Sequence, residues 1–386
     1  MKHTVIIVAA LFGVLAAGIA AAQQPATPAA PPASAPPPQL PAPDAPVLIV
    51  ASPIEYQVFQ RRTRMSGFVR VAGTVGDGLR VDARVTGQSL AGPLRGSWTT
   101  LPVDAAAHSF LAELPVAAGG WYRVEVRALR GGQTAATGAV EHVGVGEVFV
   151  GSGQSNSTSY AEYKTQPQSG MVVSYDGIQW VIANDPQPGA QDITGAKAQK
   201  GSFWPSFGDA MYAHYKVPIG VAVTGHGGTG TNLWMPDASI GLFKGTMVRV
   251  SQLGVGGFRA LLWHQGESDF NTPADTYAAR MAIIIATSHQ RAGWAFPWFV
   301  AKASYEGPLG RFSELTAAGQ KQLWDKGIAL RGPDTDVLTG DNRDSTGTHF
   351  SLKGLKSHGE AWAMAVESYL DPLLAAQDKQ ARNGQR

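Results

Sequence analysis

The chain has 386 residues, which is long for one ordinary domain and indicates two. Its hydrophobic content of 44% is sufficient for sizeable cores. The net charge is only +2 with both signs spread along the chain, which argues against a basic nucleic-acid-binding stripe and an acidic tail. The absence of cysteine excludes disulfides, thiolate catalysis and Cys-ligated metals.

The first 46 residues have the composition of a leader and a spacer. A basic start at Lys2, an apolar run from Val5 to Ala22 and the small residues at its end indicate a secretory signal peptide over residues 1–22. An uncleaved anchor is the alternative, because the run is nearly long enough to span a bilayer. Residues 23–46 hold ten of the 25 prolines and predict a semi-rigid linker. We expect an exported protein, periplasmic or secreted, with no membrane insertion after the signal is cleaved.

The next region, residues 47–142, has a period of two. Apolar and polar residues alternate over 79–85 and 121–128, which places one set of side chains on a buried face. Glycine-containing turns separate such runs, so we expect a small antiparallel β-sandwich. We expect Trp98 and Trp121 to serve in packing, with sugar stacking as the alternative.

After residue 142, short apolar runs alternate with helical stretches, a pattern typical of a mostly parallel sheet covered on both faces. We therefore expect a three-layer α/β/α domain over residues 143–375 and a C-terminal tail over 376–386. The expected strands are 147–151, 171–174, 219–224, 258–263 and 298–302, and the expected helices lie near 206–215, 275–290, 313–326 and 353–370.

Four polar clusters follow predicted strands or precede the last predicted helix. Parallel strands would bring the first three to one rim of the sheet, where ligands bind in open α/β sheets, and a loop before the last helix can reach the same rim. The clusters are Gly153-Gln154-Ser155-Asn156, Gly225-His226-Gly227-Gly228-Thr229, Trp263-His264-Gln265-Gly266-Glu267-Ser268-Asp269 and Asp344-Ser345-Thr346-Gly347-Thr348-His349-Phe350.

These residue types suit acyl transfer. A serine hydroxyl such as that of Ser155 is a weak nucleophile until a histidine takes its proton, and an acid orients that histidine. Glycine N–H groups and a Gln or Asn amide can stabilise the oxyanion. Each residue also has a simpler interpretation: Ser155 as a turn or cap residue, His349 as a polar residue before a helix, Glu267 and Asp269 as helix caps. Their joint occurrence at strand ends favours catalysis.

Other motif classes fit poorly. The Ser155 segment lacks the second glycine of the G-x-S-x-G elbow, so an α/β-hydrolase fold is disfavoured. The sequence has no P-loop, no G-x-G-x-x-G opening a helix and no H-E-x-x-H motif. We therefore expect neither a metal nor an organic cofactor.

In these clusters the chain resembles the SGNH-type carbohydrate esterases that include sialate O-acetylesterases and acetyl xylan esterases. The resemblance covers residues 143–370 and implies a flavodoxin-like SGNH-hydrolase domain. The block at 263–269 is its most specific part. The preceding β-rich region also looks like the sandwich that precedes this catalytic domain in some bacterial relatives.

The resemblance implies roles for individual residues. Ser155 corresponds to the nucleophile and His349 to the general base. The backbone N–H of Ser155, that of Gly227 or Gly228 and the side chain of Gln265 would form the oxyanion hole. The substrate-binding candidates are Gln154, Asn156, Asn232 and Trp234, and Trp204 is a further candidate for sugar stacking, with packing in the core as the alternative for both tryptophans.

The sequence departs from the family pattern at the acid. The residue three before His349 is Thr346, whereas Asp344 lies five before, so we favour Glu267 as the acid, with Asp344 as the alternative and a joint role for both left open. Asn232 stands where many relatives carry a Glu. We expect a serine esterase that removes acetyl groups from carbohydrates, with an acylated carbohydrate as partner. The alternatives are an esterase of peptidoglycan, another polysaccharide or an acyl polymer, and a carbohydrate-binding module with a degenerate site.

Overall fold

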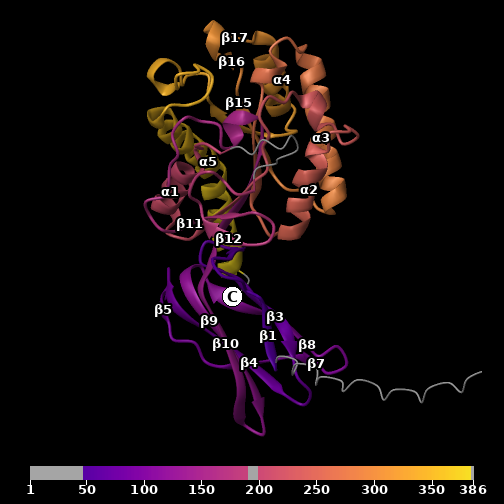
Figure 1. Cartoon of the computed structure of the whole chain (residues 1–386), viewed down its shortest axis with the longest axis vertical. Coiled ribbons are helices and arrows are strands. Elements are labelled where there is room, and N and C mark those ends of the chain that lie inside the picture. Colours follow the sequence, from indigo (N-terminus) through magenta and orange to yellow (C-terminus); the bar gives the residue numbers. More distant parts are fainter. Residues whose placement is uncertain (1–46, 190–198, 384–386) are drawn as a thin grey trace, which may run out of the picture. The chain divides into compact units, whose positions relative to one another are not determined.

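A computed structural model of the chain describes residues 47–189 and 199–383 (Figure 1). The expected signal peptide and linker, residues 1–46, lie outside this described part. None of the described helices combines the length and apolar character needed to cross a membrane. The described part is mixed α/β, as the sequence predicts.

The N-terminal part of the described chain is made of β-strands. The apolar set of the predicted alternation is buried, as Val81, Ala83, Tyr122 and Val124 show. Asp82 of the polar set is buried as well, because it accepts hydrogen bonds from Thr100 and Arg127. One sheet has the order β1-β3-β8-β7, and the other strands pair around β4, β9 and β10. Their bounds are β1 (Leu48–Ser52), β2 (Val58–Gln60), β3 (Ser66–Val75), β4 (Arg80–Ser89), β5 (Gly92–Leu94), β6 (Thr99–Leu101), β7 (Val103–Asp104), β8 (Ser109–Ala117), β9 (Gly119–Arg130) and β10 (Gln133–Gly153).

Strand β10 runs through both parts of the described chain. Its first half pairs antiparallel with β9, and its last residues pair parallel with β13 (Ile219–Val223) and β14 (Ala260–His264). The sheet order there is β12-β11-β13-β10-β14-β15-β18. The remaining strands are β11 (Val172–Tyr175), β12 (Trp180–Ile182), β15 (Trp298–Lys302), β16 (Tyr305–Glu306), β17 (Arg311–Phe312) and β18 (Leu330–Asp334).

Side chains of the parallel strands divide between two apolar clusters, because successive residues of a strand point to opposite faces. Phe149 and Leu262 belong to the cluster that holds residues of α1 (Trp204–Tyr215) and α5 (Leu352–Asn383). Val150 and Leu261 belong to the cluster that holds residues of α2 (Leu242–Leu253), α3 (Ala274–Ala292) and α4 (Glu314–Asp325). In Figure 1, α1 and α5 accordingly lie together, and α2, α3 and α4 lie together on the other side of the sheet.

The predicted elements are found within a few residues, with one clear correction. The last helix does not end near residue 370, and the expected tail is helical as far as Asn383. The helix contains Pro372. The helix continues through it because Leu370 and Leu374, one turn apart, are both fully buried.

The strand order places a topological switch at β10. From β10 the chain passes to β11 and β13 on one side of it and then crosses to β14 on the other side. Connections that diverge in this way leave a crevice at the carboxyl end of the strand. The Ser155 turn begins directly after that end of β10.

Candidate active site

The first cluster is held at the end of β10 by its contact with β14. Gly153 has a φ of +125°, and a Cβ there would lie 2.1 Å from the carbonyl oxygen of His264, so a side chain is excluded. The N–H of Gln154 donates to the same carbonyl at 2.9 Å. The short 3₁₀-helix η1 (Ser155–Ser157) follows and presents Ser155, which is only 6% exposed.

The second cluster lies beside the first. The N–H of His226 donates to the carbonyl of Gly153 at 2.9 Å. Gly227 is packed against Tyr160, since a Cβ at Gly227 would lie 2.5 Å from that ring. The Tyr160 ring in turn stacks on His349, with 5.9 Å between ring centroids. The expected oxyanion glycines therefore lie near both the Ser155 turn and the His349 loop.

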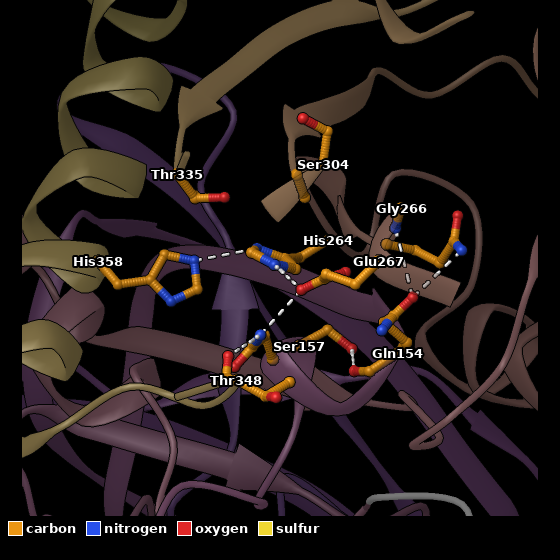
Figure 2. A network of polar contacts seen from close by, with 12 residues as sticks. Gln154, Ser157, His264, Gly266, Glu267, Ser304, Thr335, Thr348 and His358 are labelled. Atoms are coloured by element: carbon orange, nitrogen blue, oxygen red, sulfur yellow. Dashed lines mark hydrogen bonds and ion pairs between the residues drawn. The ribbon is translucent and has the colours of Figure 1, made fainter. Parts of the chain in front are cut away.

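The third cluster is joined to the first by the amide of Gln154. Its Oε1 accepts from Gln265 Nε2 at 3.2 Å, from the N–H of Gly266 at 3.3 Å and from that of Ser268 at 3.0 Å, as Figure 2 shows in part. Gln265 Nε2 also donates to Asp269 Oδ2 at 2.7 Å. Gln154 and Gln265 are 3% and 0% exposed, so both amides brace the Ser155 turn from inside rather than facing solvent.

Glu267 connects the Ser155 turn with the His349 loop through Asn156. Glu267 Oε1 accepts from Asn156 Nδ2 at 2.8 Å, and the same Nδ2 donates to the carbonyl of Thr348 at 3.2 Å. Asn156 and Thr348 are the chain neighbours of Ser155 and His349. The structure thus joins the two segments that carry the expected nucleophile and base, and the Asn156 side chain is engaged by protein groups.

Behind Glu267 lies a buried pair of histidines that the sequence analysis did not single out (Figure 2). Glu267 Oε1 lies 3.2 Å from His264 Nε2, and His264 Nδ1 lies 3.1 Å from His358 Nε2. Trp362 Nε1 also donates to His358 Nε2 at 3.1 Å. An indole nitrogen only donates, so this His358 nitrogen is an acceptor and His264 Nδ1 must carry a proton. One signal was visible in the sequence, because His358 lies one helical turn before Trp362 within the predicted last helix.

This arrangement fixes the charge of Glu267. Burial acts to raise its pKa, but the charge of His264 and hydrogen bonds from His264 and Asn156 outweigh burial and lower the pKa to about 2. Burial and the neighbouring His264 hold the pKa of His358 well below the usual value. Glu267 is therefore an anion at neutral pH, and His264 and Asn156 lie against its Oε1.

His349 lies in a tight loop with Asp344. The N–H of Asp344 donates to the carbonyl of His349 at 2.9 Å. Asp344 Oδ1 accepts from the N–H of Thr346 at 2.9 Å and from its hydroxyl at 2.5 Å, and that hydroxyl lies 3.4 Å from His349 Nδ1. Within the described part, neither Asp344 nor Glu267 makes a hydrogen bond to the imidazole.

The electrostatic surroundings of His349 lower the pKa of its imidazole. Partial burial lowers its pKa, and the charges of Asp344 and Glu267 partly offset this by raising it. The net shift is downward, so the imidazole is neutral at neutral pH, as a general base must be. Arg343 holds the loop by donating to the carbonyl of Thr348 at 2.8 Å and to that of Leu338 at 2.6 Å.

The remaining expected substrate residues differ in their exposure to solvent. Asn232 is exposed in η2 (Thr231–Trp234). Trp234 is 1% exposed, and its Nε1 donates to Thr229 Oγ1 at 2.9 Å. Trp204 is fully buried and donates to the carbonyl of Ser157 at 2.9 Å. The two tryptophans serve in the core and leave no open face for sugar stacking. Over the described residues, no group of three or more His, Asp and Glu side chains is arranged to hold a metal ion.

The chain matches a sequence model described as "Carbohydrate esterase, sialic acid-specific acetylesterase" over residues 145–368, more than half of its length. No curated protein matches the chain. Among solved structures, a carbohydrate acetylesterase from Xanthomonas citri is 19% identical with a TM-score of 0.52, over 81% of this chain and 73% of that one. The likeness to that structure shows a shared fold.

Two further solved structures are more distant. A protein from Arabidopsis thaliana is 18% identical with a TM-score of 0.47, over 57% of this chain and 98% of that one. A family two carbohydrate esterase from Clostridium thermocellum, in complex with cellohexaose, is 11% identical with a TM-score of 0.37, over 80% of this chain and 90% of that one.

Proposed function

Because the chain belongs to the carbohydrate esterase family of sialic acid-specific acetylesterases, we propose that it is an exported serine esterase that removes O-acetyl groups from carbohydrates. The observation that carries the proposal is the meeting of the Ser155 turn and the His349 loop through Asn156 Nδ2 and the carbonyl of Thr348. The sequence separates these two segments by almost two hundred residues. The fold places them at the switch point of the sheet, where ligands bind.

In the proposed reaction, Ser155 Oγ attacks the acetyl carbonyl while His349 takes the hydroxyl proton. The tetrahedral intermediate collapses as His349 returns that proton to the departing sugar oxygen, which leaves an acetyl group on Ser155. Water, deprotonated by His349, then attacks the acetyl-enzyme. Acetate leaves, and Ser155 recovers its proton. The lowered pKa of His349 supports its part as the base.

Backbone donors form the centre of the proposed oxyanion hole. We assign this role to the N–H groups of Ser155 and of Gly227 or Gly228, because the two turns that carry them are joined by the hydrogen bond from the N–H of His226 to the carbonyl of Gly153. Gln265 was expected to contribute its amide. Its Nε2 already faces Gln154, Thr229 and Asp269, so we assign it the task of fixing the turn that carries Ser155.

We assign the acid to Asp344 rather than to Glu267. Glu267 is occupied by His264 and Asn156, at 3.2 and 2.8 Å. Asp344 belongs to the same loop as His349, and its charge is the larger of the two carboxylate effects on the pKa of His349. Glu267 then supports the site through Asn156, and it adds to the negative potential around the imidazole.

The finer features of the architecture are also proposals. The two apolar clusters on opposite sides of the parallel sheet support a three-layer α/β/α domain over residues 143–375. The pairing of β1, β3 and β8 in one sheet and of β4 with β9 in another supports a β-sandwich over residues 47–142. Exposed Asn232 remains a candidate for contacts with the sugar.

The proposal is tested by hydrolysis of p-nitrophenyl acetate and of acetylated oligosaccharides. Ser155→Ala should lower kcat by about 10⁴–10⁶-fold with the fold intact, because the residues of a catalytic triad act as a unit. Ser345→Ala is the matched control, since Ser345 is exposed on the neighbouring loop and should retain wild-type rates. Wild-type rates no higher than the Ser155→Ala background on every ester would favour a carbohydrate-binding module with a degenerate site. Activity confined to other acyl esters would favour another ester substrate.

A further inference from the structure

The loop from Asp344 to His349 is closed by its own backbone, with a threonine hydroxyl at its centre. The carbonyl of His349 accepts from the N–H of Asp344, and the carbonyl of Asp344 accepts from that of Gly347, each at 2.9 Å. An isolated β-bridge joins Arg343 to Phe350 just outside the loop. These contacts fix how far Asp344 lies from His349 and leave Thr346 between them.

The direction of the hydrogen bonds at Thr346 follows from chemistry. A carboxylate oxygen carries no proton, so the Thr346 hydroxyl donates to Asp344 Oδ1. The lone pairs of the hydroxyl oxygen are then left for donors. The N–H groups of Thr348 and His349 approach it at 3.2 Å each, and His349 Nδ1 lies 3.4 Å away. Because the hydroxyl proton is committed to Asp344, a hydrogen bond between Thr346 and His349 requires that Nδ1 of the imidazole carries the proton.

We propose that the Thr346 hydroxyl is a positioning group that links His349 to the Asp344 carboxylate, so that the site works through Ser155, His349, Thr346 and Asp344 in series. This inference rests on the proposed esterase function and deepens it. A proton held on Nδ1 leaves Nε2 of the imidazole unprotonated and free to receive the proton of Ser155. The Thr346 proton stays on its own oxygen throughout, and no bond at Thr346 forms or breaks.

The electrostatic effect of the link is to stabilise the imidazolium. When His349 takes a proton at Nε2, the Nδ1–H bond becomes more polar, and the Thr346 oxygen, polarised by Asp344, accepts it more strongly. The distance of 3.4 Å is long for a hydrogen bond in the resting site. Catalytic hydrogen bonds of this kind often shorten only once substrate is bound.

The first test compares Thr346→Val, which removes the hydroxyl and retains the shape, with Thr346→Ser, which retains the hydroxyl. On p-nitrophenyl acetate, Thr346→Val should lower kcat about 10–100-fold with KM little changed, because a hydrogen bond to a charged group is lost. Thr346→Ser should stay within about threefold of wild type. Combining Asp344→Asn with Thr346→Val should lower kcat little further than Thr346→Val alone, because both residues act through the same link.

The second test moves the carboxylate instead of deleting it. In Asp344→Asn/Thr346→Asp the single acid stands at the position of the bridging oxygen, so kcat should recover to within about tenfold of wild type. Asp344→Asn alone should remain at least about tenfold below the double variant. A double variant no better than Asp344→Asn would overturn the inference.

A third measurement needs no turnover. In an NMR titration, Thr346→Val should lower the pKa of His349, because the imidazolium loses its acceptor, whereas Thr346→Ser and the loop control Ser345→Ala should leave it unchanged. An unchanged pKa in Thr346→Val, or a kcat equal to that of wild type, would contradict the link. If the wild type itself hydrolyses no ester, the proposed function fails, and the titration still decides whether the link exists.

Discussion

The residues beside Ser155 and His349 in the chain fix the positions of these two residues. Gln154 and Asn156 flank Ser155, and both side chains are committed to protein partners rather than to solvent. The sequence predicted the residue types at the site but not these partnerships. The contact between His264 and His358 joins residues 94 positions apart, and only the folded sheet brings them together.

Glu267 is the residue whose ionisation should be visible in the stability of the protein. Its pKa is about 2 in the folded state against an ordinary 4.5, so its anion stabilises the fold at neutral pH. Removing one partner of a buried ion pair costs about 3 kcal/mol of unfolding free energy, and we expect this loss in Glu267→Gln near pH 7. The stabilisation is fully present above 4.5 and is lost as the pH falls through about 2, so the difference from wild type should shrink over that window.

Urea unfolding of both proteins across this pH range checks the expectation. The matched control is Glu360→Gln on the exposed pair with Lys356, which should change the unfolding free energy by less than about 1 kcal/mol. A loss in Glu267→Gln that persists unchanged at the lowest pH would show that packing, rather than charge, accounts for it.

Among the helices and strands, the best predicted are those whose sequence pattern of apolar residues agrees with the residues that are buried in the fold. Strand β15 has the predicted bounds 298–302, and four of its five residues are buried. Helix α2 was missed because Thr246, Val248 and Val250 are β-branched residues that suggest a strand. Strand β18 was missed because it contains Gly332 and Pro333. Proline is tolerated there because β18 is an edge strand of its sheet.

The junction of β10 and β14 should be sensitive to a single methyl group. Gly153→Ala would force a Cβ against the carbonyl of His264 at a positive φ, so we expect the unfolding free energy to fall by at least about 2 kcal/mol and esterase activity to be lost. Gly170→Ala is the control, because Gly170 also has a positive φ but a Cβ there meets nothing within 4 Å. Thermal unfolding of both variants would separate the clash from the φ cost, and equal losses would contradict the close approach.

In the described chain, β10 pairs antiparallel with β9 over its first half and parallel with β13 and β14 over its last residues. The sequence predicts a change near residue 142 from strands of period two to alternating strands and helices. The elements do change there, but β10 continues unbroken from Gln133 to Gly153. A buried ion cluster marks this passage: Glu147 accepts from Arg61 at 2.7 Å and from Arg259 at 2.8 Å. No local pattern could predict it, because Arg61 and Arg259 come from segments almost two hundred residues apart.

The central claim is that Ser155 carries the acetyl group during turnover. The most direct measurement is mass spectrometry of the protein quenched with acid within the first turnovers on p-nitrophenyl acetate, followed by peptide mapping. We expect one added acetyl group on the peptide that contains Ser155, absent from Ser155→Ala and accumulating in Thr346→Val if that variant slows deacylation more than acylation. An acetyl group on another residue, or hydrolysis by wild type with Ser155→Ala equally active, would contradict it.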